Sequence, residues 1–192
     1  PQRGDIRIGG KSLKALAYDN LLKSLSFVFQ DAVLFQDTVF NNLRIGKPSA
    51  GMEEVVAAAK RARCHEFIMQ MECGYDTVLG EGGTKLSGGE KQRLAIARAL
   101  VKDAPIVLLD EMTANMDVEN EVKVQQALRE LLKDKTVIMI AHKLSTVKNA
   151  DQILVLEDGT ISQRGTHFEL LAQEGLYQRL WNIQYKAERW HF

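Results

Sequence analysis

The stretch Ile106-Val107-Leu108-Leu109-Asp110-Glu111 sets four apolar residues directly before two acids. A short apolar run without polar alternation is typical of a strand that is buried on both faces of a parallel sheet. Ligands of open α/β sheets bind beyond the carboxyl ends of the strands. The stretch therefore predicts a buried parallel strand that carries Asp110 and Glu111 to a ligand site. A strand end that is merely solvated is the alternative interpretation.

A second apolar run, at residues 136–141, is followed directly by His142. The segment between the two runs, residues 118–133, has helical character, so strand, helix and strand form a crossover unit of the right-handed βαβ kind. A lone histidine is usually structural, but this one stands at the equivalent end of the next strand. We therefore expect a doubly wound α/β core with acids and a histidine at one site.

The residues before this core are predicted to start with α/β character and then to become helical. An edge strand is expected at residues 5–8, a short helix at 21–25 and a strand at 26–29 that ends at Gln30. An apolar helical stripe begins near residue 49, where Glu53 and Glu54 suit a first turn because acids favour helix N-termini. We expect a helical insertion here, followed by a glycine-rich loop at residues 74–84.

The segment Leu86-Ser87-Gly88-Gly89-Glu90 opens the next predicted helix, which runs to about Val101. Arg93 and Arg98 are expected on the polar side of this helix. Its serine and glutamate have the spacing of a capping box. A helix start offers unpaired amides and a positive dipole end, and two glycines let a phosphate approach the backbone closely. The segment thus predicts either an anion site or an ordinary capped helix.

The residues beyond His142 predict a hairpin and closing helices. The turn Glu157-Asp158-Gly159-Thr160 separates two apolar stretches, and Asp-Gly is a favoured tight turn between strands. The sheet is therefore expected to be mixed, although mainly parallel. Thr166 and Glu169 have the spacing of a second capping box. After them Tyr177, Trp181 and Tyr185 form a stripe at helical spacing, which we interpret as packing.

Charge and composition exclude several classes of function. The 25 Lys and Arg residues balance 25 Asp and Glu residues among 192, so no global field favours nucleic acid or anionic lipid as a partner. The apolar runs are far shorter than the ~20 residues that cross a bilayer. Cys64 and Cys73 do not define a disulfide framework and are expected to be reduced structural thiols.

Several features, taken in chain order, together resemble the ABC ATPase family over essentially the whole chain. They are Gln30, the segment 86–90, the stretch 106–111, Asp117 and His142. The resemblance implies a P-loop NTPase-like core with ATP and Mg²⁺ as ligands. Gln30 would touch the metal and the attacking water, Asp110 would hold Mg²⁺ through water, and Glu111 would polarise the attacking water. His142 would contact the γ-phosphate.

The same resemblance implies an assembly of two such domains. Ser87, Gly88 and Gly89 would grip ATP bound to the opposing subunit, and Asp117 would belong to the D-loop between the subunits. Residues 77–83 resemble an exporter-specific loop that touches transmembrane domains. The implied partners are therefore a second nucleotide-binding domain and transmembrane domains, fused upstream, at the cytoplasmic face of the cell membrane. No nucleic-acid partner is expected.

The sequence departs from the family pattern in two places. Met112, Asn115 and Met116 replace commoner small and aliphatic residues before Asp117. The sequence also lacks a P-loop of the form G-x-x-x-x-G-K-[ST], because Gly9-Gly10-Lys11-Ser12 would need a glycine where Asp5 stands. We therefore expect an N-terminal truncation with the P-loop upstream. The resemblance implies that the strand leading into the P-loop lies beside the strand that ends at Asp110.

These predictions combine into one domain of 192 residues. A helical subdomain at about residues 47–102 would be inserted into a catalytic core at 1–46 and 103–165, with helices at 166–192. The predicted function is an ATP-hydrolysing motor that drives export. The alternative is a non-catalytic or degenerate ABC module that acts only as an interaction partner.

Overall fold

The computed structural model describes residues 3–110, 117–141 and 143–189. The chain divides into two compact units, Pro1–Met139 and Ile140–Phe192. Each unit is described by itself.

The first unit contains the following elements in chain order: β1 (Arg7–Ile8), β2 (Lys11–Ser12), the 3-10 helix η1 (Leu13–Ala15), α1 (Tyr18–Ser24), β3 (Leu25–Val28), α2 (Val39–Arg44), α3 (Met52–Arg61), α4 (His65–Met69), η2 (Gly74–Asp76), η3 (Glu81–Gly83), α5 (Gly88–Lys102), β4 (Ile106–Asp110), α6 (Val118–Leu132) and β5 (Thr136–Ile140), whose last residue opens the second unit. The second unit continues with α7 (Leu144–Val147), β6 (Ile153–Glu157), β7 (Thr160–Gly165), α8 (His167–Ala172) and α9 (Leu176–Arg189).

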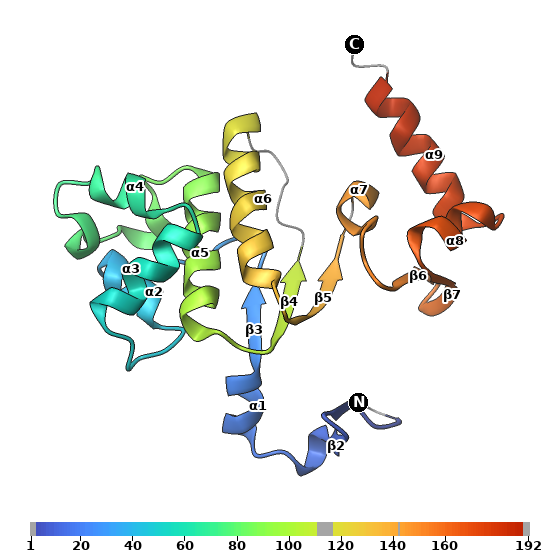
Figure 1. Ribbon diagram of the computed structural model, residues 1–192, viewed down its shortest axis with the longest axis horizontal. Helices are drawn as coiled ribbons and strands as arrows, with labels where there is room; N and C mark the ends of the chain where they lie inside the picture. Colours follow the sequence, from blue (N-terminus) through green and yellow to red (C-terminus); the bar gives the residue numbers. More distant parts are fainter. Residues whose placement is uncertain (1–2, 111–116, 142, 190–192) are drawn as a thin grey trace. The chain divides into compact units, whose positions relative to one another are not determined.

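The central sheet has three strands in the order β3-β4-β5 (Figure 1). β3 and β4 are parallel, with Leu25 opposite Ile106 and Val28 opposite Leu109. The predicted strands and the crossover through α6 are thus confirmed. The expected neighbour of β4 is wrong, because β3 and β5 occupy both of its edges. A further strand could join this sheet only at the outer edge of β3 or β5.

One face of the central sheet is packed against helices α5 and α6. Val28, Val107 and Leu109 point into a core that α5 completes with Leu94 and Ile96, all of which are buried. Val124, Leu128 and Leu131 of α6 belong to the same core. Helical spacing of apolar residues on both helices explains this layer, because it gives each helix one face to bury.

The opposite face of the sheet is exposed at β3 and β5 and half-buried at β4, so the predicted burial on both faces is wrong for β5 and only partly met by β4. Phe27 is 44% exposed and Ile138 60% exposed. Burial alternates along β5 between residues that pack on the core and residues that do not. The predicted apolar run does form the strand β5. Burial of its second face would need a further layer of structure, which the described residues do not supply.

We expect the 192-residue polypeptide to aggregate or to bind hydrophobic dyes when purified alone. Leaving several large apolar side chains in water costs about 1.5–3 kcal/mol each, against a total domain stability of about 5–15 kcal/mol. Dye fluorescence and thermal unfolding of the polypeptide check this expectation. A sharp, reversible transition of a monomer would show that the exposed sheet face is tolerated.

The helical part of the first unit follows the prediction from residue 49 onward. It forms α3 and α4, which a left-handed backbone at Arg63 (φ 56°) separates. The 3-10 turns η2 and η3 occupy the predicted glycine-rich loop. Helix α2 was not predicted from the sequence. The division at residues 47 and 102 stays a prediction.

In the second unit β6 and β7 pair antiparallel as a separate two-stranded sheet. Asp158 (φ 48°) and Gly159 (φ 77°) form the predicted tight turn, since both have positive φ. The capping box at the start of α8 is present. Tyr177 is buried and donates to, or accepts from, His167 Nδ1 at 2.8 Å, so packing explains that part of the stripe, whereas Tyr185 is exposed. None of the helices that the structure describes is long and apolar enough to span a bilayer.

Candidate functional site

Gln30 and Asp110 lie at the carboxyl edge of the central sheet. Because Val28 pairs with Leu109 in a parallel register, Asp110 ends β4 where the chain leaves β3 toward Gln30. Both residues are exposed. Glu111 and His142 lie outside the described residues, so their predicted places at this edge stay predictions.

The backbone at Gln30 is held by a residue of α5 that sequence reasoning missed. Gln92 is buried, and its Nε2 donates to the carbonyl oxygen of Phe29 at 3.3 Å and to that of Gln30. Gln92 belongs to the helix that the segment 86–90 opens. Its burial could not be foreseen, because a glutamine at a helical position is usually exposed.

The segment after Gln30 is braced by Asn42 and Arg98. Asn42 is buried, accepts from the Phe35 amide at 2.9 Å and donates to the Phe35 carbonyl at 3.0 Å. Arg98 donates to the carbonyl of Asn42 at 2.9 Å and to that of Val33 at 2.9 Å. Burial lowers the pKa of Arg98. Arg98, predicted on the polar side of α5, is therefore half-buried and engaged by backbone carbonyls.

This braced segment lies beside the loop that resembles an exporter-specific element. The Val39 amide donates to the Thr77 carbonyl at 2.9 Å, and the Leu79 amide donates to the Asp37 carbonyl at 2.9 Å. Val33, Phe35 and Val78 are exposed, at 58%, 52% and 64%. Two stretches that are distant in sequence thus present apolar side chains to solvent from adjoining loops.

The start of α5 has the predicted capping box. The Glu90 amide donates to Ser87 Oγ at 3.3 Å, while the Ser87 amide donates to Glu90 Oε2 at 2.8 Å. Within the described part of the chain, no hydrogen bond engages the amides of Gly88 and Gly89. An added Cβ at Gly88 would meet no atom within 4 Å. The helix therefore presents two unpaired amides, and open space lies beside Gly88, as an anion site requires.

Gly89 has a different role from Gly88, because it is packed against α6. An added Cβ at Gly89 would lie 2.7 Å from Cβ of Asn120 and 2.9 Å from its Cγ. Such separations are far below van der Waals contact. Glycine is thus required at this buried position by the close approach of α6, and its amide makes no hydrogen bond within the described part of the chain.

Asn120 also joins α5 to the start of α6 by hydrogen bonds. Its Oδ1 accepts from Arg93 Nη1 at 2.6 Å, and its Nδ2 donates to Asp117 Oδ2 at 2.6 Å. Asp117 Oδ1 accepts from the Asn120 amide at 2.9 Å, so Asp117 is the N-cap of α6. The hydrogen bonds from the backbone and side chain of Asn120 hold the pKa of Asp117 below its usual value. The sequence predicted a site role for Asp117, which stays a prediction, and did not single out Asn120.

Arg93 is buried, contrary to its predicted position on the polar side of α5. It is only 4% exposed, and its guanidinium carbon lies 5.2 Å from the centre of the Phe67 ring. Burial lowers the pKa of Arg93, although nearby acids, Glu90 foremost, oppose this. A buried guanidinium is costly unless its donors are engaged. Asn120 engages Nη1 of Arg93, whereas Nε has no hydrogen-bond partner among the described residues.

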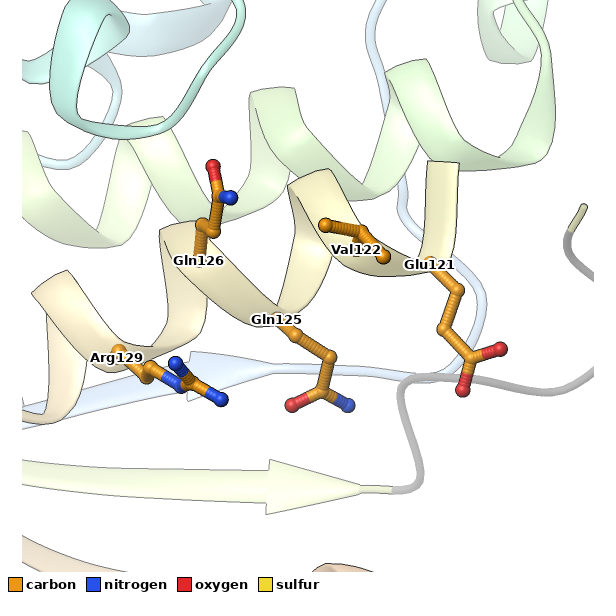
Figure 2. Close-up of a pocket in the computed structure, with 5 residues that line it drawn as sticks. All are labelled: Glu121, Val122, Gln125, Gln126 and Arg129. Atoms are coloured by element: carbon orange, nitrogen blue, oxygen red, sulfur yellow. The ribbon is translucent and has the colours of Figure 1, made fainter. Parts of the chain in front are cut away.

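A shallow groove of about 300 Å³ lies along the outer face of α6 (Figure 2). It is lined by Glu121, Val122, Gln125, Gln126 and Arg129. None of the predicted site residues lines it. The sheet edge and the start of α5 therefore remain the better candidates for a ligand site.

The donor set at the sheet edge suits magnesium. Mg²⁺ is usually held by one or two carboxylates together with substrate phosphates and water. Asp110 offers an exposed carboxylate and Gln30 an exposed amide oxygen at the same edge. Among the residues that the structure describes, no three acidic, histidine or cysteine side chains gather to hold a metal. These two residues therefore suit Mg²⁺ that is bound together with substrate phosphates rather than by the protein alone.

Comparison with known proteins gives consistent results. A family model described as ABC transporter matches residues 1–114. The ATP-dependent lipid A-core flippase of Syntrophus aciditrophicus (strain SB) is 46% identical over 186 residues, which is 97% of this chain and 31% of that protein. A solved structure of a bacterial Atm1-family ABC exporter with ATP bound has a TM-score of 0.87 and 44% identity, and covers 96% of this chain and 32% of its own. The chain thus spans about a third of the length of these relatives.

Proposed function

The chain belongs to the ABC transporter family, and we propose that it is the ATP-hydrolysing domain of an exporter, working as one of a pair of such domains to drive transport across a membrane. The observation that carries the proposal is the start of α5, where two unpaired amides and the open space beside Gly88 suit a phosphate. One of the relatives named above is an ATP-dependent lipid A-core flippase and the other is an ABC exporter, which supports a role in ATP-driven export.

In this proposal each ATP is bound from two sides, by the sheet edge of one subunit and by the start of α5 of the other. The carboxylate of Asp110 and the amide oxygen of Gln30 would hold Mg²⁺, which would supply positive charge to neutralise the phosphates. Glu111 orients and polarises the attacking water, and His142 contacts the γ-phosphate. Ser87 and the amides of Gly88 and Gly89 bind the γ-phosphate of the ATP held by the other subunit. Positioning and electrostatic stabilisation supply most of the rate.

The surface formed by Val33, Phe35 and Val78 is proposed to dock on the transmembrane domains. These side chains are exposed and apolar, and the loops that carry them are joined by backbone hydrogen bonds. The buried brace of Asn42 and Arg98 fixes the loop that follows Gln30. Movement of the docked transmembrane domains would therefore be transmitted to Gln30 through this braced loop. We therefore propose that the domain lies at the cytoplasmic face of the membrane.

The test of this proposal is hydrolysis of Mg-ATP by the full-length protein in lipid. We expect phosphate release and a rise of the thermal unfolding midpoint with Mg-ATP, because a ligand that binds only the folded state stabilises it. Absence of both effects would contradict the proposal. A raised midpoint without turnover would support the alternative, a non-catalytic module that binds nucleotide and acts through its partners.

A further inference from the structure

We infer that Asn120 is a positioning residue, which couples the phosphate-binding start of α5 to the D-loop acid Asp117 of the same subunit. The inference rests on the proposed function and adds a residue to it. It is carried by the bonds and contacts that converge on this one side chain.

The orientation of the Asn120 amide is fixed by its two partners. Its oxygen faces the cation of Arg93 at 2.6 Å, and its nitrogen faces the carboxylate of Asp117 at 2.6 Å. Both bonds involve a charged partner, and such bonds are shorter and stronger than bonds between neutral groups. The amide dipole is thus aligned from cation to anion, and a flipped amide would oppose both charges.

The position of the Asp117 carboxylate is set by Asn120. One carboxylate oxygen accepts from the Asn120 backbone at 2.9 Å, and the other accepts from its side chain. Arg93, at the other end, is 4% exposed and packs over Phe67. A displacement of α5 at Arg93 must therefore move Asn120 or break its bond, and Asp117 follows Asn120.

Gly89 provides a second, steric link between the same two helices. Its missing side chain leaves the space that Asn120 fills, with only 2.7 Å from an added Cβ to Cβ of Asn120. Gly89 is one of the two residues at the start of α5 whose amides make no hydrogen bond in the described part of the chain. A phosphate that draws the start of α5 toward itself therefore acts on Asn120 through both contact and hydrogen bond.

The expected effect is on turnover rather than on ATP affinity. Asn120→Ala in the full-length protein should lower kcat at least about tenfold, since tenfold is the effect of losing one bond to a charged partner and the side chain makes two. KM for ATP should stay within about twofold, since Asn120 does not touch nucleotide in the proposal. Gln126→Ala is the matched control, because Gln126 is an exposed amide of the same helix. It should leave kcat and KM unchanged.

Asn120→Asp separates positioning from a purely structural role. An aspartate keeps an acceptor for Arg93 and gains an ion pair with it, but it sets a second carboxylate against Asp117. We expect the thermal midpoint to be retained while kcat falls as in Asn120→Ala. If Asn120 had only a structural role, a variant that keeps its thermal midpoint would also keep its kcat.

Each result bears on the inference. Wild-type kcat in Asn120→Ala or in Asn120→Asp overturns it, as does a loss in Asn120→Ala that appears in KM alone. If Asn120→Asp fails to fold, the inference is tested by whether the loss of activity in Asn120→Ala appears in kcat or in KM. Failure of the proposed function looks different, because the unmodified protein would then show no turnover at all.

Discussion

Glu111→Gln is expected to slow ATP hydrolysis by the full-length protein by roughly 10²–10⁴-fold, the usual contribution of a positioned general base. Glutamine has the shape of glutamate but cannot polarise water as a carboxylate does. Nucleotide binding should survive, because Glu111 acts on the water rather than on ATP in this proposal. The measurement is the rate of phosphate release at saturating Mg-ATP, together with nucleotide affinity.

Glu157→Gln is the matched control for this substitution. Glu157 is likewise an acid at the end of a strand, β6, and it is exposed. Its replacement should leave turnover unchanged. If Glu111→Gln also turns over at the rate of the unmodified protein, Glu111 is not the base, and the non-catalytic alternative gains.

Gly88→Asp is expected to abolish the ATP-dependent association of two domains. The open space beside Gly88 would receive a carboxylate, which repels phosphate at the two free amides. Nucleotide binding to the subunit's own sheet edge should remain nearly intact. Association can be measured with Glu111→Gln present, to slow hydrolysis, on a polypeptide that contains a P-loop as well as residues 1–192.

Gly51→Asp offers a control with the same change of charge. Gly51 is the N-cap of α3, and an added Cβ there meets nothing within 4 Å. Aspartate is a favourable N-cap, so the fold should tolerate it. Undiminished association with Gly88→Asp would mean that the start of α5 does not face the other subunit's nucleotide.

The features that the sequence predicted well are those that local chemistry determines. The capping boxes at Ser87 and Thr166 and the Asp158-Gly159 turn depend only on neighbouring residues, and all three are present. The parallel strands were predicted because an uninterrupted apolar run has few alternatives. Asp110 came from the same logic, since ligands bind at the carboxyl ends of parallel strands, whereas the role of Gln30 came from the resemblance to the ABC ATPase family.

The features that the sequence did not predict depend on distant parts of the chain. Arg93 and Arg98 occupy helical positions that look polar, but α6 and the loop after Gln30 bury them. Asn120 is an ordinary residue of a first helical turn until Gly89 lies against it. The order of the strands and the exposed face of β5 follow likewise from pairing and packing, which no local pattern contains.

The central claim, that a working site combines the sheet edge of one subunit with the α5 start of the other, is tested by mixing two inactive proteins. One carries Glu111→Gln and the other Gly88→Asp. A dimer that contains one subunit of each variant has one site with an intact Glu111 from one subunit and an intact Gly88 from the other. Random pairing would restore up to roughly a quarter of the ATP turnover of the unmodified protein, since half the dimers are mixed and each has one good site. A mixture as inactive as its two components would contradict the claim.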